Sequence, residues 1–590
     1  MTPEAWLTAA VVIAILAGLV LDVASPSVLV FTGVVVLLFA GVIDSSQALA
    51  GFSNPAPFTV AALFVLARAV AKTGAIRPYT QGLLGETGHT RRPMLRMLVP
   101  TITLSGMMNN IPMVAMMIPE VTSWARRRGS DVAKFLLPLA YGASLGGMMT
   151  LIGTSTNLVV AGQMTEAGME QFAFFELGAI GLPAAILGLI ALVALSPRLL
   201  AGRTSPAAQI RDEDVRDFSI QMEVVPDGAL DGITVDEAGL RHLEGVFLVA
   251  IDRRDTVIAP ARPDTVLRGG NRLTFVGRVD MVLDLEHLRG LRHAEHRQVS
   301  AVRDRSAAYF IVAIGGDSPL VGRTLKESGF RSRYQAAVLA IHRAGHRIDA
   351  KLGEVPIHTG DALVLLSDPG FRDRWAGRSD FLLISALDED IQPAAPGGWL
   401  VVGILITVIL LAALGIVPIL YAALGAAILL IALRILTPDE ARRAIDLEVI
   451  GVIASAFGLA AAMETSGLAA HISSGLVTLF GALGEAGVLA GVVLATIALT
   501  EFVTNNAAAL LMFPIAVSSA QAAGVDPRGM AVAVAIAASA CFLTPLGYQT
   551  NTMVYGPGGY RIADYLRVGA PLTLIVFGLV VWLVPVIYGL

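Results

Sequence analysis

The chain has 590 residues, of which 55% are hydrophobic and 15% charged, and its formal net charge is −5. Its mean hydropathy is +0.70. Soluble globular proteins do not have this composition, so it predicts a polytopic membrane protein. Because Cys541 is the single cysteine, an intrachain disulfide is excluded.

Hydropathy divides the chain into two apolar halves around a charged insert, in which "RDEDVRD" and "HRAGHR" occur. The insert itself contains two similar segments. We therefore expect four units: a membrane unit over 1–200, two soluble units over 201–295 and 296–392, and a second membrane unit over 393–590.

Apolar runs long enough to span a bilayer recur along both halves. In the first half they lie near residues 7–23, 28–43, 56–72, 131–162 and 174–196. In the second half they lie near residues 398–415, 417–434, 448–464, 529–556 and 568–588. These runs predict an all-helical membrane domain.

Two further runs contain paired asparagines, in "LSGMMNNIPMVAMMIP" (104–119) and "TEFVTNNAAALLMFP" (500–514). Arginines precede and follow the first run, which places both of its ends in the cytoplasm: Arg91, Arg92, Arg96, Arg126, Arg127 and Arg128. The second run lies in a tract, 444–527, without Lys or Arg, so both of its ends face outward. Each run therefore predicts a re-entrant hairpin. The halves become inverted repeats, each of five spans plus one hairpin, with the insert in the cytoplasm.

An inverted repeat predicts matching sequence, and "TLIGTSTNLVVAG" (150–162) aligns without gaps on "TPLGYQTNTMVYG" (544–556). Repeats with interrupted helices are typical of secondary transporters, whose sites lie near the bilayer midplane. At the hairpin tips and at Gly153 and Gly547 we expect the helices to unwind. Freed carbonyl and Asn oxygens would suit Na⁺, and helix N-termini would suit an anion.

The paired-Asn hairpins and the Gly-Thr-x-x-Asn segments resemble the divalent anion/sodium symporter family. That family belongs to a transporter superfamily with an elevator mechanism. Its hairpin tips carry Ser-Asn-Thr, which contributes to sodium and carboxylate binding. The matching triplets here are Asn109-Asn110-Ile111 and Thr504-Asn505-Asn506, so the central Asn is kept and the flanking hydroxyls are partly replaced.

With these segments, the resemblance implies a substrate site and a cation site. Expected substrate-binding residues are Asn109, Asn110, Thr156, Asn157, Thr504, Asn505, Asn506, Thr550 and Asn551. Expected Na⁺ ligands are Ser105, Asn110, Gly153, Thr154, Asn505 and Gly547. No cofactor other than the coupling ion is expected.

The soluble insert is duplicated, because "GITVDEAGLR" (232–241) matches "GRTLKESGFR" (322–331). Alternating apolar strands predict small α+β units. The pattern resembles tandem TrkA-C (RCK-C) domains, which implies a cytoplasmic location, pairing and binding of a regulatory nucleotide or other small ligand. No Gly-rich dinucleotide fingerprint precedes these units.

The function expected is elevator-type symport of a small anion, such as sulfate or a di/carboxylate, with Na⁺ or H⁺, in the cell membrane. The protein would not be an enzyme or bind nucleic acid, and the family suggests a homodimer. Alternatives are a cation/proton antiporter, a metalloid-oxyanion exporter of the same superfamily, or a membrane sensor. The asparagines could also simply join packed helices.

Overall fold

The computed structural model describes most of the chain. The described residues are 1–21, 23–74, 90–128, 130–200, 219–240, 246–253, 256–258, 261, 264–277, 290–293, 308–316, 318–343, 346–348, 350, 352–368, 370–375, 378, 380–386 and 398–589. Residues 201, 295, 296, 392 and 393, where the expected units meet, lie outside them.

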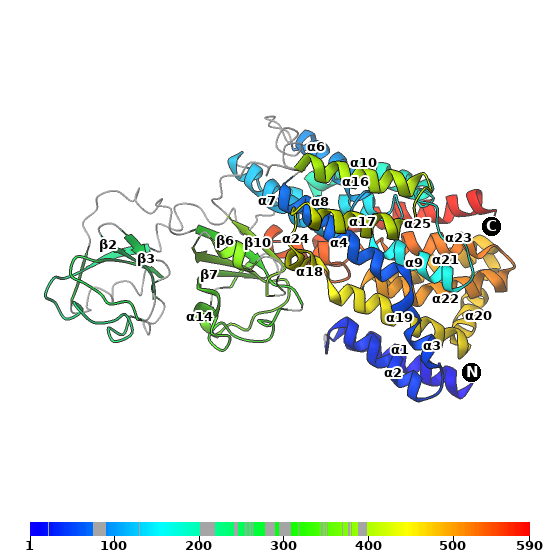
Figure 1. Cartoon of the computed structure of the whole chain (residues 1–590), viewed down its shortest axis with the longest axis horizontal. Coiled ribbons are helices and arrows are strands. Elements are labelled where there is room, and N and C mark those ends of the chain that lie inside the picture. Colours follow the sequence, from blue (N-terminus) through cyan, green and yellow to red (C-terminus); the bar gives the residue numbers. More distant parts are fainter. Residues whose placement is uncertain are drawn as a thin grey trace.

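The first half of the membrane domain is helical (Figure 1). Its described helices are α1 (Pro3–Val20), α2 (Pro26–Phe39), α3 (Ser45–Ser53), α4 (Pro55–Thr73), α6 (Arg91–Ser105), α7 (Asn110–Arg127), α8 (Ala133–Gly147), α9 (Ser155–Glu166) and α10 (Gly178–Leu199). Local sequence explains several ends. For example, α4 begins after the capping side chain of Asn54 with Pro55 at its first position, and ends at Gly74, whose φ is 59°.

The second half is also built from long and short helices. Its described elements are α16 (Gly398–Ala413), α17 (Ile419–Ala432), α18 (Pro438–Ala444), α19 (Leu447–Thr465), α20 (Leu468–Phe480), η4 (Gly481–Leu483), α21 (Glu485–Thr500), α22 (Asn505–Ala523), α23 (Pro527–Ala538), α24 (Gln549–Gly558) and α25 (Ile562–Tyr588). A shared apolar core extends through both halves.

Six helical segments among the described residues are long and apolar enough to cross a bilayer. Others are shorter because the chain breaks them. The run at 131–162 is divided into α8 and α9, and the run at 529–556 into α23 and α24. The interruptions contain Gly153 and Gly547, where the sequence predicted unwinding. Both paired-Asn runs form two helices joined by a short turn, with Asn110 and Asn505 at the start of the second helix.

The insert forms two five-stranded antiparallel sheets. The first has β1 (Ser219–Val224), β2 (Val246–Arg253), β3 (Thr256–Ile258), β4 (Arg272–Gly277) and β5 (Leu291–His293), in the order β3-β2-β4-β1-β5. The second has β6 (Ala308–Ala313), β7 (Ala336–Arg343), β8 (His346–Arg347), β9 (Ala362–Ser367) and β10 (Leu383–Ala386), in the order β10-β6-β9-β7-β8. Short helices α14 (Phe330–Tyr334), η3 (Leu352–Glu354) and α15 (Phe371–Trp375) accompany the second sheet.

The two sheets have the same topology, because β1 to β5 correspond in order to β6, β7, β8, β9 and β10. Even an irregularity is repeated. The register shifts between Leu248 and Ala250 where β2 pairs with β4, and between Val338 and Ala340 where β7 pairs with β9. Each sheet has its own apolar core. The duplication predicted from sequence is therefore present in the described strands.

The second soluble unit packs against the membrane domain, and Figure 1 shows its strands β6 and β10 beside α24 and α7. The turn before β9 approaches α24 closely. A Cβ added at Gly556 of α24 would lie 2.8 Å from the Gly360 carbonyl oxygen and 3.0 Å from Ala362 Cβ. Asp361 braces the turn, since it accepts from Arg343 Nε and Nη2 at 2.8 and 2.7 Å.

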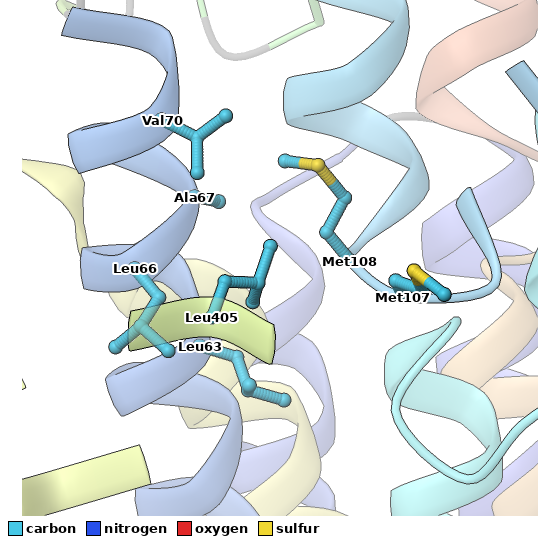
Figure 2. Close-up of a pocket in the computed structure, with 7 residues that line it drawn as sticks. All are labelled: Leu63, Leu66, Ala67, Val70, Met107, Met108 and Leu405. Atoms are coloured by element: carbon cyan, nitrogen blue, oxygen red, sulfur yellow. The ribbon is translucent and has the colours of Figure 1, made fainter. Parts of the chain in front are cut away.

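A small apolar cavity lies between the first hairpin tip and helices α4 and α16 (Figure 2). Met107 and Met108 approach it from the tip, and Leu405 approaches from α16. Its volume of about 10 Å³ leaves room for no more than about one water molecule. The tip therefore meets these two helices through side chains that make no directional bonds across the cavity.

Candidate functional site

The tip between α6 and α7 holds a buried cluster of oxygen atoms. Ser105 Oγ donates to the Ala143 carbonyl at 2.8 Å and lies 2.5 Å from Asn110 Oδ1. The same Oδ1 position lies 3.0 Å from the Ala143 carbonyl oxygen and 3.1 Å from that of Gly153. Oxygens this close in a buried site need hydrogens or a cation between them. Either a rotated Asn110 amide, which turns its N–H groups toward them, or a small hard cation fits this position.

The tip between α21 and α22 holds a second cluster built in the same way. Thr500 Oγ1 donates to Asn505 Oδ1 at 2.9 Å and to the Ala538 carbonyl at 2.7 Å. The sequence separations, 5 and 38 residues, equal those of the first cluster. Asn505 Nδ2 is buried and has no hydrogen-bond partner. The two hairpins thus place a hydroxyl, an Asn amide and an Ala carbonyl in equivalent positions.

An asparagine beyond each interruption holds the unwound segment in shape. Asn157 Nδ2 donates to the carbonyls of Gly147 and Thr150 at 3.0 and 2.8 Å. Asn551 Nδ2 donates to the carbonyls of Cys541 and Thr544 at 2.9 and 3.2 Å. Again the separations agree, at 10 and 7 residues. Both Oδ1 atoms are buried without a hydrogen-bond partner, which leaves each segment a free acceptor.

Each hairpin tip contacts the interruption of the opposite half. Asn110 lies 2.9 Å from Tyr548 Oη, at the start of α24. Asn506 Oδ1 accepts from Ser155 Oγ and Thr156 Oγ1 at 3.0 and 3.2 Å, at the start of α9. The N-termini of α7, α9, α22 and α24 therefore meet in two pairs. Helix N-termini carry free N–H groups and partial positive charge, so this arrangement favours an anion.

Glycines leave the space that the first cluster occupies. A Cβ added at Gly147 would lie 2.6 Å from Asn110 Oδ1 and 2.7 Å from its Nδ2. A Cβ at Gly153 would lie 2.6 Å from the Gly147 carbonyl oxygen. Neither distance is compatible with a real side chain, so the close approach of tip and interruption requires glycine at both positions.

Glu501, which follows the second cluster's Thr500, is a buried carboxylate with 4% of its surface exposed. Its Oε1 accepts from the backbone N–H groups of Phe542 and Leu543, each at 2.9 Å. Its Oε2 lies 3.6 Å from Cys541 Sγ, which donates to it. The residue therefore ties the end of α21 to the interruption between α23 and α24.

Most site residues predicted from sequence lie in these clusters, but some have other partners. Thr504 is exposed and caps α22 by accepting from Ala507 N at 3.4 Å. The buried hydroxyl beside Asn505 is that of Thr500, which sequence reasoning did not select. Asn109 accepts from Ile111 N at 3.1 Å, and Thr154 Oγ1 lies 3.4 Å from Thr156 Oγ1.

Thr550 Oγ1 is buried and has no hydrogen-bond partner. The structure adds other groups to the two clusters: Ala143, Gly147, Thr500, Tyr548, Ala538 and Glu501. Thr500 could have been found from the shared spacing, because Ser105 and Thr500 both stand five residues before their Asn.

Within the residues that the structure describes, no group of three or more His, Cys, Asp or Glu side chains could hold a metal ion. The candidate cation ligands are instead neutral hydroxyl, amide and carbonyl oxygens. Such ligands suit a hard cation and do not suit a transition metal.

Comparison with known proteins gives the wider context. The profile of the citrate transporter family matches residues 11–537. The chain is 34% identical over 567 residues to a putative sulfur deprivation response regulator of Chlamydomonas reinhardtii, covering 94% of this chain and 96% of that protein. It is 34% identical over 573 residues to an uncharacterized transporter of Synechocystis sp., covering 94% and 92%.

A more distant relative carries a more specific name. The chain is 24% identical over 742 residues to sodium/sulfate cotransporter 1 of Chlamydomonas reinhardtii, covering 90% of this chain and 83% of that protein. These matches agree with a multi-pass membrane protein whose apolar helices surround a polar site. The chain belongs to the citrate transporter family and is a transporter, not an enzyme.

Proposed function

We propose that this protein is a secondary active transporter that couples movement of a small anion to Na⁺. The observation that carries the proposal is the pair of matching oxygen clusters at Asn110 and Asn505, beside four helix N-termini. Neutral oxygens would bind the cation and helix N-termini the anion. The names of relatives, citrate transporter and sodium/sulfate cotransporter, favour sulfate or a di/carboxylate as the substrate.

Substrate and coupling ion are tested in one experiment. Purified protein in liposomes receives radiolabelled sulfate, citrate or succinate under an imposed Na⁺ or proton gradient. We expect uptake of at least one anion that requires inward Na⁺. Equal uptake with Na⁺ and with K⁺ would contradict Na⁺ coupling, and no uptake of any anion under either gradient would contradict anion symport.

A proton-coupled antiporter or metalloid-oxyanion exporter is the second candidate, and Glu501 favours it. A buried carboxylate within the membrane domain is a candidate functional residue by default, and proton relay is one of its known roles; this one is 4% exposed. If this second candidate is correct, transport in the liposome experiment should follow the proton gradient and persist without Na⁺.

The inverted-repeat elevator belongs to the same proposal. Equal hydrogen-bond spacings in the two halves support the repeat. The apolar contact of Met107 and Met108 with α4 and α16 supports a hairpin that can slide, because no directional bond crosses that cavity (Figure 2). The family resemblance alone supports a homodimer.

Topology gives the first prediction. In a Cys541→Ser background, a cysteine at Ser130 should label with a membrane-impermeant reagent from the cytoplasmic face. A cysteine at Glu166 should label from the opposite face. Ser205, which was expected to be cytoplasmic as well, lies outside the described residues. Labelling of positions 130 and 166 from the same face would contradict the re-entrant hairpin.

We also propose that the soluble units, which resemble tandem TrkA-C domains, regulate transport from the cytoplasm, where a nucleotide or other small ligand would act. Their route to the site is short. The Gly360–Ala362 turn contacts Tyr555 and Gly556 of α24, whose first turn contains Asn551. A shift of this turn would therefore displace α24, the helix that follows the second interruption. Passive tethering is the competing explanation.

Ala362→Arg tests this route. The corresponding residue of the first unit is Arg272, which pairs with β1 as Ala362 pairs with β6 and is exposed. The sheet therefore accepts arginine at this position, but the buried contact with Gly556 does not. We expect a folded protein whose uptake rate changes several-fold, with Arg272→Ala as the unchanged control. Wild-type rate in the folded Ala362→Arg variant would leave tethering as the explanation.

A further inference from the structure

The two candidate cation clusters are not equivalent in charge. In the first half, Thr150 Oγ1 donates to the Gly106 carbonyl at 2.5 Å, and in the second half Thr544 Oγ1 donates to the Glu501 carbonyl at 2.9 Å. Gly106 and Glu501 therefore hold the same structural position, directly after Ser105 and Thr500. Of these two residues, only Glu501, in the second cluster, has an acidic side chain.

We propose that Glu501 provides the fixed negative charge of the second cation site and sets its affinity for the coupling cation. The proposal rests on the Na⁺ coupling proposed above. It adds that cation binding at only one of the two sites depends on a charged side chain. In this protein the first site would bind its cation through neutral oxygens alone. The second would bind through Thr500, Asn505 and the Ala538 carbonyl, in the field of a nearby carboxylate.

The geometry keeps this charge beside the site. Glu501 adjoins Thr500 in the chain, and a Cβ added at Gly547 would lie 2.3 Å from the Thr500 carbonyl oxygen and 3.2 Å from Glu501 Cα. Gly547, one of the expected cation ligands, thus lies beside the backbone of Glu501, and Asn505 lies beside the preceding Thr500. Because Glu501 is buried, water screens its charge only weakly, so that charge favours a cation bound by the neighbouring residues.

The hydrogen bonds that Glu501 accepts compensate only part of the cost of burying its negative charge. Both backbone N–H groups, of Phe542 and Leu543, donate to Oε1, whereas Oε2 has the weak donor Cys541 Sγ at 3.6 Å. Among the described residues Glu501 forms no ion pair, and a buried carboxylate without one is costly. A cation in the adjacent cluster would offset that cost, so cation and carboxylate should stabilise each other.

Glu501→Gln separates charge from position. Glutamine retains an oxygen that can accept from both Phe542 N and Leu543 N, so the interruption keeps its hydrogen bonds while the charge is lost. We expect the Na⁺ concentration for half-maximal uptake to rise by at least about tenfold. The maximal rate at saturating Na⁺ should remain. Glu485→Gln, which removes an exposed charge from the first turn of the same helix α21, should leave the Na⁺ dependence unchanged.

A second measurement does not need transport. Na⁺ should raise the thermal unfolding temperature of the purified wild-type protein, and much less that of Glu501→Gln. If Glu501→Gln does not fold, Glu501→Asp decides, because it keeps the charge. The proposal requires its Na⁺ dependence to stay within several-fold of wild type, and a loss of Na⁺ response in folded Glu501→Asp would overturn it.

The outcomes separate this proposal from the function on which it rests. Anion uptake by wild type that does not need Na⁺ would remove the Na⁺-coupled function itself. Na⁺-dependent uptake by wild type together with an unchanged Na⁺ dependence in folded Glu501→Gln would overturn only the role of Glu501. It would then remain a side chain that positions the 541–543 segment.

Discussion

Asn110→Ala and Asn505→Ala should each abolish transport or reduce it by at least about a hundredfold, while leaving folded protein in the membrane. Asn110 lies between Ser105, Ala143, Gly153 and Tyr548, so truncation removes the group around which these oxygens are arranged. A buried polar group left without its partner costs about 1–3 kcal/mol. When two or more polar groups of one site lose their partner, the site should no longer bind its ligand well enough for transport.

The measurement is Na⁺-driven anion uptake in liposomes, normalised to protein that elutes as a single species. Thr504→Ala is the control, because that side chain is exposed and only caps α22. Loss of a cap costs about 1 kcal/mol of stability, so its uptake should stay close to wild type. Full uptake by both Asn variants would show that these residues only pack the hairpins.

The large-scale architecture followed from sequence because membrane physics restricts it strongly. Composition, span length and the distribution of arginine predict membrane helices and two helix–turn–helix segments, and the described helices agree with both. The interruption at Gly153 could be predicted because its segment recurs at Gly547. The duplicated soluble sheets could be predicted from the matching stretches at 232–241 and 322–331.

The finer site could not be predicted in the same way, because it depends on contacts between distant segments. Nothing in the sequence near Asn110 indicates that Tyr548 is its partner, 438 residues away. The same holds for Glu501, whose carboxylate accepts hydrogen bonds from Phe542 N and Leu543 N, 41 and 42 residues away. Nor does the sequence show that the Gly360 turn contacts Gly556.

Thr504 shows where a motif taken from a resemblance differs from the local geometry. The resemblance placed it in the binding triplet, and the local geometry makes it a helix cap instead. The buried hydroxyl is that of Thr500, four residues earlier at the end of α21, which lies 2.9 Å from Asn505 Oδ1 and 2.7 Å from the Ala538 carbonyl oxygen. The triplet points to this tip and to Asn505, but the buried hydroxyl beside Asn505 comes from the end of the preceding helix α21.

Gly147→Ala is expected to have an effect as large as that of Asn110→Ala, although it removes no polar group. The added methyl would lie 2.6 Å from Asn110 Oδ1, so the amide must move away from Ser105 and the Gly153 carbonyl. In an ordinary helix, Gly to Ala stabilises by about 1 kcal/mol. Here the same change should leave thermal stability nearly intact and abolish Na⁺-driven uptake.

Gly142→Ala, one turn earlier on α8, is the matched control. Its added methyl would lie 2.8 Å from Leu98 Cδ2, the end of a flexible side chain that can rotate, and not from the Asn110 amide. Overpacking of this kind usually costs about 1–3 kcal/mol of stability, but it leaves the Asn110 amide in place, so we expect uptake by the folded variant within about twofold of wild type. If Gly142→Ala and Gly147→Ala lose transport equally, the requirement is for close helix packing along α8. Loss at Gly147 alone ties transport to the position of one amide, because the two variants differ in what the new methyl contacts.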